Sequence, residues 1–224
     1  MRLFLKKVLL FLGYIFHHNH DSKIIYYHDV SKKYTAMGTE YALIQKHFEL
    51  VMRNGYVFVE QINKPTRQIM VCFDDGWAGI YDYKDWFIEK HIFPTIFIAV
   101  DLIGKAGYLN ECQITDLKNS GFRFMAHTWS HQDLTTFNNE GLKHELLDSK
   151  IKLELLFGET FDALCFPMGR FSKEVKEKSQ EFGYNQLFSS LPGGYYDLSE
   201  QKLICRNCMQ NASPLEFKWQ ISFV

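Results

Sequence analysis

The chain has 224 residues, of which 46% are hydrophobic and 16% aromatic, and its formal net charge at pH 7 is −1. A chain of this length can bury a full apolar core, and we expect one domain of barrel size. The near-neutral charge argues against nucleic acid and against an anionic membrane as the main partner, because both select basic surfaces. Five cysteines without the spacing of a disulfide framework indicate a reducing compartment.

The N-terminal segment, residues 1–20, is set apart by an apolar run that follows three basic residues. The run is too short to span a membrane, and no small-residue cleavage site follows it. We expect residues 1–16 to form an amphipathic helix that closes the bottom of the domain or rests on a membrane surface, with an uncleaved anchor as the alternative. His17, His18 and His20 fit a solvated linker better than a metal site. The expected location is the cytoplasm, with membrane association as an alternative.

The remaining residues, 21–224, are predicted to alternate between strands and helices in a single domain. The expected strands cover 23–27, 56–60, 68–73, 95–100, 122–126, 163–166, 186–189 and 203–208. The expected helices cover 39–54, 77–91, 114–119, 138–157 and 172–182. This alternation predicts a parallel sheet, and roughly eight such units in one domain indicate a barrel. In parallel barrels the reactive groups lie where the strands end.

Two adjacent acids, Asp74 and Asp75, follow the apolar run 68–73 directly, and Gly76 comes next. Neighbouring carboxylates repel each other, and chains tolerate them most often where a bound cation offsets the charge. The alternative is a loop acid followed by the N-cap of a helix, since the next segment has a helical pattern. This stretch alone leaves both interpretations open.

Two histidines, His127 and His131, follow the expected strand 122–126. Residues four apart lie on one face of a helical turn, so both imidazoles could converge on one ion. Imidazole suits zinc and its neighbours, and one carboxylate would complete a three-ligand site with an open position for water. A lone pair at this spacing more often marks a solvated helix face. Because the acids and the histidines both follow strand ends, they could share one rim, and together they predict a metal site.

Several motifs resemble those of the NodB-like polysaccharide deacetylases, the fourth carbohydrate esterase family. Residues 72–76 (CFDDG) resemble the family's TFDDG motif, and residues 127–131 (HTWSH) match its H-[ST]-x-x-H motif. Residues 166–170 (FPMGR) resemble the YPYGR turn of shorter members, and residues 26–30 (YYHDV) resemble the YHxV first strand of that subgroup. The similarity runs from about residue 24 to residue 206, so it covers nearly the whole chain.

The resemblance implies a distorted (β/α)7 barrel and metal-dependent removal of an N-acetyl group from an amino sugar, with release of acetate. It implies that Asp75, His127 and His131 bind one divalent ion, with Zn²⁺ expected and Co²⁺, Ni²⁺ or Mn²⁺ as alternatives. Asp74 would be the general base. The backbone N–H of Met168 would bind the oxyanion, and this donor does not depend on the side chain.

The chain also departs from the family pattern. Where long-form members have an arginine that tunes the base, this chain has Cys165. We expect Arg206 to replace it, with a surface arginine on an edge strand as the alternative. The family's late histidine, the general acid, is missing, because no histidine follows His144. Either Asp74 carries the proton or His28 does, although His28 fits a supporting or core role equally well.

The remaining expectations concern the substrate. We expect Trp77, Trp129 and Pro167 to contact it, and Trp219 to serve packing instead. The expected partner is an acetylated amino-sugar glycan or a lipid- or nucleotide-linked precursor, and not nucleic acid. Two alternatives stay open. One is a catalytically impaired family member that binds a glycan, and the other is a deformylase-like amidohydrolase on the same scaffold.

Overall fold

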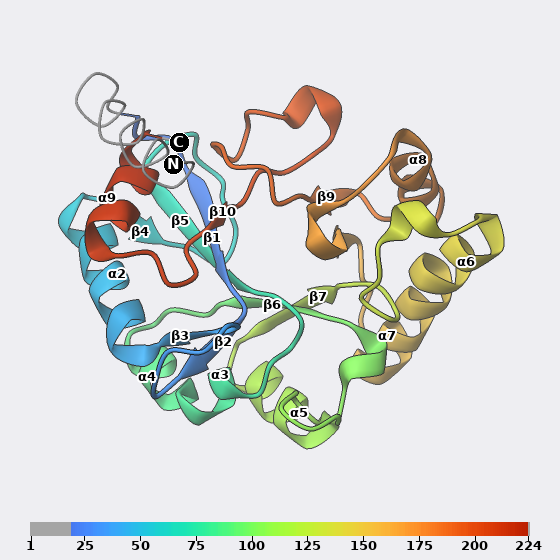
Figure 1. Ribbon diagram of the computed structural model, residues 1–224, viewed down its shortest axis with the longest axis horizontal. Coiled ribbons are helices and arrows are strands. Elements are labelled where there is room, and N and C mark those ends of the chain that lie inside the picture. The colour runs from blue at the N-terminus through green and yellow to red at the C-terminus, as the bar shows by residue number, and fades with distance from the viewer. Residues whose placement is uncertain (1–18, 224) are drawn as a thin grey trace.

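The computed structural model describes residues 19–223 (Figure 1). The expectations for residues 1–16, for His17 and for His18 fall outside this range, so the amphipathic helix and its membrane contact stay predictions. None of the helices within the described range is long and apolar enough to cross a membrane.

The centre of the fold is a curved sheet in which every strand pair is parallel. The strand order is β10-β1-β5-β6-β7-β8-β9, and β4 pairs with the start of β5. The strands are β1 (Lys23–Tyr27), β4 (Val57–Phe58), β5 (Gln68–Phe73), β6 (Thr95–Ile98), β7 (Arg123–Ala126), β8 (Ala163–Cys165), β9 (Gln186–Phe188) and β10 (Asn207–Cys208). This curled parallel sheet confirms the predicted distorted barrel (Figure 1).

One short segment connects the two edges of the sheet. Ile204 forms a parallel bridge with Phe188 of β9, whereas Asn207 pairs with Ile25 of β1. The predicted strand 203–208 is therefore confirmed only for its last two residues, because the segment changes its partner strand midway. Arg206 lies at this change of partner.

Helices cover the outer face of the sheet (Figure 1). They are α2 (Tyr41–Arg53), α3 (Gly79–Asp82), α4 (Lys84–Glu89), α5 (Glu111–Asn119), α6 (Asn139–Lys143), α7 (Ser149–Phe157), α8 (Lys173–Glu181) and α9 (Pro214–Phe223). Short turns complete the set: η1 (Val100–Leu102), η2 (Leu134–Thr136), the π-helical η3 (His144–Asp148), η4 (Pro167–Gly169) and η5 (Ser199–Gln201).

Helix α9 is missing from the sequence prediction, and the prediction differs from the structure in three further places. The predicted helix 77–91 is two helices that meet at Tyr83, which has non-helical backbone angles. The predicted helix 138–157 contains the π-helical turn η3. Two short strands, β2 (Asp29–Ser31) and β3 (Gly38–Glu40), form a separate parallel pair that the sequence pattern does not indicate.

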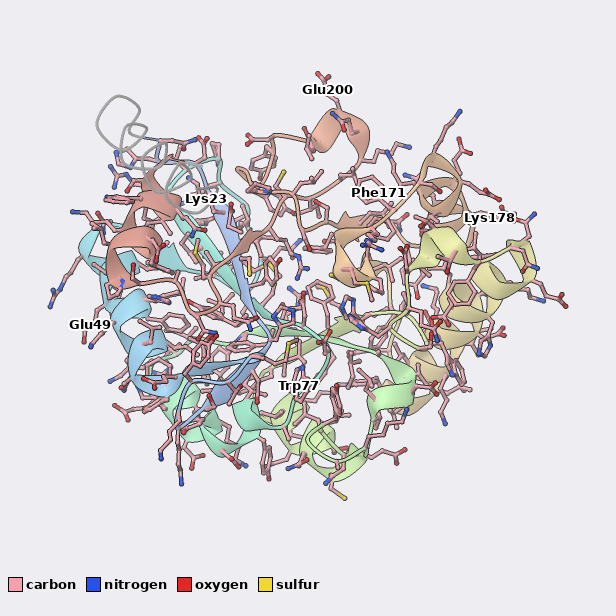
Figure 2. All side chains as sticks on the ribbon, viewed as in Figure 1. Lys23, Glu49, Trp77, Phe171, Lys178 and Glu200 are labelled. Carbon is pink, nitrogen blue, oxygen red and sulfur yellow. The ribbon has the colours of Figure 1, made fainter. Side chains whose placement is uncertain are left out.

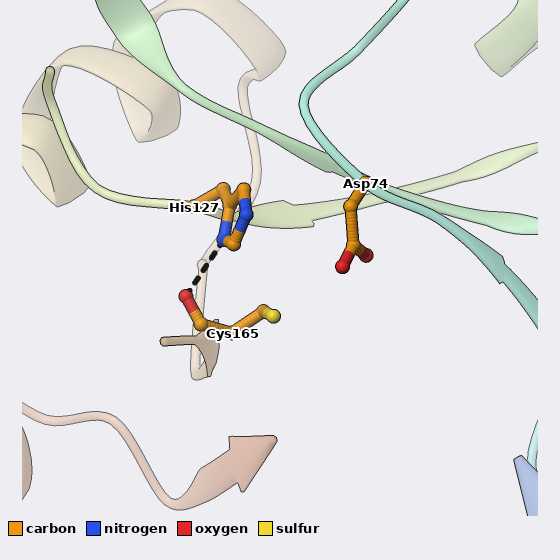
Figure 3. Close-up of side chains that lie close together, drawn as sticks. All are labelled: Asp74, His127 and Cys165. Atoms are coloured by element: carbon orange, nitrogen blue, oxygen red, sulfur yellow. Dashed lines mark hydrogen bonds between the residues drawn. The ribbon is translucent and has the colours of Figure 1, made fainter. Parts of the chain in front are cut away.

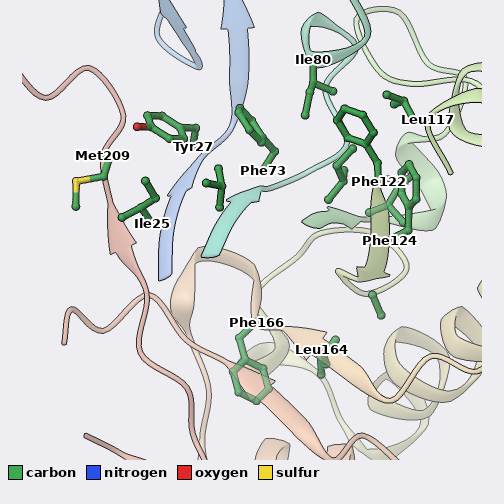
Figure 4. Packing of buried hydrophobic residues seen from close by; sticks show 14 of the residues in the cluster. Ile25, Tyr27, Phe73, Ile80, Leu117, Phe122, Phe124, Leu164, Phe166 and Met209 are labelled. Carbon is green, nitrogen blue, oxygen red and sulfur yellow. The ribbon is translucent and has the colours of Figure 1, made fainter. Parts of the chain in front are cut away.

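The alternation of side chains along each strand divides the core in two. Ile25 and Tyr27 of β1 pack against the helices in the larger cluster, part of which Figure 4 shows. Ile24 and Tyr26 point to the other face, into a smaller cluster inside the barrel that includes Cys72, Phe97, Met125 and Cys165. The candidate site forms at the strand ends, above this inner cluster.

Candidate metal centre

The two acids leave the end of β5 in different directions. Asp74 continues the sheet, since its N–H donates to the Tyr27 carbonyl at 3.0 Å. Asp75 and Gly76 then both adopt left-handed backbone angles, with φ of 70° and 75°. This reversal separates two carboxylates that would otherwise repel each other. Helix α3 begins only at Gly79 and has no side-chain cap, so the N-cap interpretation of the acid pair is wrong.

The histidine pair does not lie on a helical turn, contrary to the sequence prediction. His127 to His131 form a loop after β7, and η2 begins only at Leu134. Thr128 and His131 have φ of 69° and 59°, which a right-handed helix does not allow. The hydroxyl of Thr128 accepts a hydrogen bond from the His131 N–H at 3.2 Å. The imidazoles converge because this loop folds back, and their ring centres lie 4.8 Å apart.

Both imidazoles meet the carboxylate of Asp75. The Oδ1 atom of Asp75 lies 3.3 Å from Nε2 of His127 and 3.0 Å from Nε2 of His131. The three candidate ligand atoms all lie within 4.8 Å of one another. Asp75 and His127 are buried, whereas the side chain of His131 is 26% exposed. The predicted ligand set is therefore assembled in one place, with one side open.

The chemistry of these atoms fits a cation. The Nδ1 atom of His127 forms a hydrogen bond of 2.8 Å with the carbonyl oxygen of Cys165 (Figure 3). Since a carbonyl only accepts, Nδ1 carries the hydrogen, and Nε2 of the neutral ring directs its lone pair at Asp75. Asp75 Oδ1 is buried and has no hydrogen-bond partner among the described residues. An anionic oxygen facing lone pairs is unfavourable unless a cation lies between them.

The imidazoles also explain the ionisation of Asp75. Burial alone would raise the pKa of its carboxyl group, but positive charge at His127 and His131 outweighs this and holds the pKa well below its usual range. With neutral rings, a bound cation would supply that positive charge instead. The carboxylate is thus ready to bind a metal without first losing a proton.

A second grouping, made of Asp74, His127 and Cys165, is a weaker candidate (Figure 3). Burial raises the pKa of the Cys165 thiol well above its ordinary value, so the thiolate form that binds metals is disfavoured. The guanidinium of Arg206 also contacts Asp74 and Cys165 directly. A metal ion there would lie against a fixed positive charge.

Arg206 is completely buried, so its alternative interpretation as a surface arginine is wrong. Its Nη1 and Nη2 atoms donate to the two carboxylate oxygens of Asp74 at 2.6 and 2.8 Å, and its Nε donates to the Ser189 carbonyl at 2.9 Å. The rings of Tyr26 and Phe97 lie 4.3 and 5.0 Å from the guanidinium carbon. Burial would raise the pKa of Asp74, but Arg206 outweighs it and lowers the pKa.

A cavity of about 260 Å³ opens beside these residues. Its lining consists of Tyr26, His28, Met37, Asp74, Asp75, His127, His131, Met168 and Ser190. Two further predicted residues, His28 and Met168, are thus brought to the site. Nδ1 of His28 forms a hydrogen bond with Oε1 of Gln210, and Nε2 of Gln210 donates a hydrogen bond to the Ala36 carbonyl.

Met168 lies in the turn η4 with a φ of 57°, and the residue is 60% exposed. Gly169 also has a left-handed φ, of 65°. The Gly169 N–H donates to the Phe166 carbonyl, and the Arg170 N–H donates to the Pro167 carbonyl. A Cβ atom on Gly169 would lie 2.6 Å from the Cβ of Ser190, so glycine is required here.

The three predicted substrate contacts are not among the cavity residues. Trp77, labelled in Figure 2, donates its indole N–H to Oδ2 of Asp75 at 3.1 Å and packs on Tyr108. The indole of Trp129 donates to Asp101 and lies over His144. Pro167 is the first residue of the turn η4, which also carries Met168, and it is buried. The Trp77 indole thus contacts a candidate ligand, the Trp129 indole contacts residues outside the ligand loop, and substrate contact by these three residues stays a prediction.

Besides the cavity-lining residues Met37 and Ser190, sequence reasoning missed two residues that support the site. Gln210 forms a hydrogen bond with His28, but the two residues are 182 positions apart, so no local sequence pattern connects them. Glu145 accepts hydrogen bonds from the loop between His127 and His131. A signal for Glu145 did exist: it lies beside Leu142 and Leu146 on the buried face of the helical segment, where an unpaired acid is unusual.

Comparisons with known proteins show which family the chain resembles. A family model described as polysaccharide deacetylase matches residues 61–187. The Bacillus subtilis protein YxkH, whose name assigns it to the polysaccharide deacetylases, is 25% identical over 185 residues, which are 76% of this chain and 64% of the relative. An uncharacterised 30.6 kDa protein of Geobacillus stearothermophilus is 28% identical over 158 residues, which are 69% of this chain and 57% of that protein. The chain thus spans less than two thirds of the length of each of these two relatives.

Solved structures show the same fold. The Streptococcus pyogenes deacetylase PplD, in complex with acetate, has a TM-score of 0.79 at 18% identity, over 90% of this chain and 98% of that chain. A polysaccharide deacetylase from Bacillus cereus has a TM-score of 0.77 at 22% identity, over 90% of this chain and 69% of that chain. IcaB from Ammonifex degensii has a TM-score of 0.76 at 15% identity, over 92% and 99%.

Proposed function

Since the chain belongs to the polysaccharide deacetylase family, we propose that it is a metal-dependent hydrolase that removes the N-acetyl group from an amino sugar and releases acetate. The observation that carries the proposal is the buried Oδ1 atom of Asp75, which faces two imidazoles and has no hydrogen-bond partner among the described residues. The substrate would be an acetylated glycan or a lipid- or nucleotide-linked precursor.

Asp75, His127 and His131 would hold one divalent ion, and two imidazoles with one carboxylate suit Zn²⁺, with Co²⁺, Ni²⁺ or Mn²⁺ as alternatives. When bound, such an ion lowers the pKa of a water molecule and polarises the acetamide carbonyl. The contact from Nδ1 of His127 to the Cys165 carbonyl leaves Nε2 directed at Asp75, where it would be available to bind the ion.

Asp74 would act as the general base that takes the proton of the attacking water. It lines the same cavity as the ligands, and Arg206 keeps its carboxylate ionised. Each oxygen of Asp74 accepts one hydrogen bond from Arg206 and retains a further lone pair that can accept the proton.

The backbone N–H of Met168 would donate to the oxyanion of the tetrahedral intermediate. The turn η4 uses the N–H groups of Gly169 and Arg170 in its own hydrogen bonds. Met168 lines the cavity beside Asp75 and the histidines, which supports its N–H as the donor from this turn.

His28 would protonate the leaving amine. The Ala36 carbonyl can only accept a hydrogen bond, so it receives the amide NH₂ of Gln210, and Oε1 of Gln210 must accept from His28. Nδ1 of His28 therefore carries a hydrogen, and Nε2 is the nitrogen that can deliver a proton to the amine. A shuttle by Asp74 alone is the alternative.

The second candidate is a catalytically impaired protein that binds a glycan without hydrolysing it. The missing histidine after His144 favours this candidate, as does the exposed Met168 where shorter members of the family have tyrosine. A deformylase-like reaction would use the same residues on a smaller acyl group.

Metal analysis combined with acetate assays tests the proposal. The purified protein is analysed for metal content and incubated with N-acetylated monosaccharides, oligosaccharides and lipid-linked sugars. We expect about one zinc-like ion per chain and acetate release that stops on chelation and returns with added metal. Bound metal without acetate from any substrate would favour the glycan-binding candidate, and formate release from N-formyl sugars would favour the deformylase. A protein without metal affinity would refute the site.

A further inference from the structure

A buried carboxylate lies behind the loop that carries His131. Glu145 is only 2% exposed. Its Oε2 atom accepts hydrogen bonds from the backbone N–H groups of Trp129 at 3.1 Å and Ser130 at 3.0 Å, and its Oε1 atom accepts one from the Ser130 hydroxyl at 2.6 Å. These donors belong to the two residues that directly precede His131.

The loop needs such an interaction because its backbone conformation is unfavourable. Thr128 and His131 both have left-handed φ values, and a β-branched residue such as Thr128 rarely adopts them. Between them, two consecutive N–H groups converge on one carboxylate oxygen, as in an anion-binding nest. The short sequence of the loop supplies no glycine to relax this shape, so Glu145 provides the compensating contact.

The helix that carries Glu145 is itself locally altered. Glu145 lies in the π-helical turn η3, between α6 and α7. The Ser149 hydroxyl donates to the carbonyls of Glu145 and Leu146 at 2.6 and 3.0 Å, which supports the widened turn. Such turns often accompany functional sites. Here the turn lies where Glu145 reaches both N–H groups of the loop.

The shape of the loop decides where His131 points. His127 is held separately, by the Cys165 carbonyl, so His131 depends on the loop for its position 3.0 Å from Asp75. We propose that Glu145 is a positioning residue that fixes His131 in its metal-binding orientation and adds negative charge behind the cation. This inference rests on the proposed metal-dependent function and extends it to a side chain that would not touch the ion.

The test compares zinc affinity with stability in three variants. Glu145→Ala removes all three hydrogen bonds, whereas Glu145→Gln keeps one oxygen that can accept from both N–H groups. Glu154→Gln is the matched control, because Glu154 lies on the adjoining helix α7, accepts the Phe161 N–H at 3.0 Å and pairs with Lys150. The Zn²⁺ dissociation constant is measured by competition with a chromophoric chelator, and thermal unfolding is measured without metal.

We expect Glu145→Ala to weaken Zn²⁺ binding by about 10–100-fold, Glu145→Gln to weaken it less, and Glu154→Gln to leave it unchanged. Wild-type affinity in Glu145→Ala, even with a lower melting temperature, would overturn the proposal, since the role would then be structural alone. If Glu145→Ala fails to fold, the Zn²⁺ affinities of Glu145→Gln and Ser130→Ala test the proposal instead. Wild-type affinity in both of these variants would overturn the proposal. Absence of zinc binding in the wild-type protein would instead refute the proposed function itself.

Discussion

Arg206 and Asp74 form a buried two-point ion pair between residues that are 132 positions apart in the sequence. Arg206 is fully buried and Asp74 is 4% exposed, so both charges are largely shielded from bulk solvent. Each depends on the other, because an unpaired buried charge is far more costly than a paired one.

We therefore expect Arg206→Met to lower the free energy of unfolding by about 3–5 kcal/mol, since it leaves the Asp74 carboxylate buried and unpaired. Arg206→Met combined with Asp74→Asn should recover much of this loss. Denaturant unfolding of both single variants and of the double variant measures the coupling. Strictly additive effects would show that the pair contributes no interaction energy of its own.

Asp74→Asn and His127→Ala should separate catalysis from metal binding. Asp74→Asn removes the proposed base and should lower kcat by about 10²–10⁴-fold while metal stays bound. His127→Ala removes a ligand and should lose both metal and turnover. Metal content and acetate release are measured on the same samples. Turnover by Asp74→Asn at the wild-type rate would refute the assignment of the base.

Variants of Gln210 test whether His28 is the proton donor. Gln210→Glu places an anion against Nδ1 of His28 and favours the imidazolium form. Since the acid must be protonated, the basic limb of the pH–kcat profile should move to higher pH. Gln210→Leu is the neutral control and should lower kcat without that movement. An unchanged profile in Gln210→Glu, together with an active His28→Gln variant, would instead favour Asp74 as the proton shuttle.

The turn at Met168 allows a test of a backbone donor. Met168→Ala keeps the N–H group and should leave kcat nearly unchanged. Gly169→Ala introduces a Cβ atom at a φ of 65° and 2.6 Å from Ser190, so the turn must shift. We expect a fall in kcat of about 10²-fold, as for loss of one oxyanion donor. Equal kcat values for the two variants would argue against the backbone N–H.

The stability of the protein should depend on pH through His47. Burial lowers the pKa of His47 to about 4, although its hydrogen bond to the Ala212 carbonyl partly offsets this. Because the unfolded chain binds a proton below about pH 6.5 and the folded protein does not, stability should fall as pH drops from 6.5 to 4, by up to about 3 kcal/mol.

His47→Gln provides the matched control for this pH effect. Its amide can replace both hydrogen bonds of the imidazole, which accepts from the Tyr27 hydroxyl and donates to the Ala212 carbonyl. The variant has no group that titrates in this range, so its stability should decline less between pH 6.5 and pH 4. Urea unfolding at several pH values measures the difference, and parallel curves for the two proteins would exclude His47 as the cause.

Some elements could be predicted residue by residue from the sequence. The strands Lys23–Tyr27 and Gln68–Phe73 match their predicted bounds, because buried parallel strands need uninterrupted apolar runs. The helix predictions were less accurate at 77–91 and 138–157, where the apolar periodicity continues across a break at Tyr83 and across the π-helical turn. Periodicity records which face is buried and says little about local changes in the hydrogen-bond pattern.

The sequence by itself determined the residue types of the site and their position at strand ends. The acid pair and the two histidines could be placed at one rim because the sheet is parallel and their motifs follow predicted strands, whereas only the family resemblance implied that Asp75 rather than Asp74 is the ligand. The tertiary structure alone decided that the histidines converge through a left-handed loop, and it alone gave Gln210 and Glu145 their partners. For Arg206, which the resemblance suggested as the arginine that tunes the base, it showed the two-point contact with Asp74. Those contacts join residues that are 132, 182 and 15 or 16 positions apart. Such separations leave no periodic pattern in a sequence, because closure of the barrel and packing of α6–α7 against the loop create the contacts.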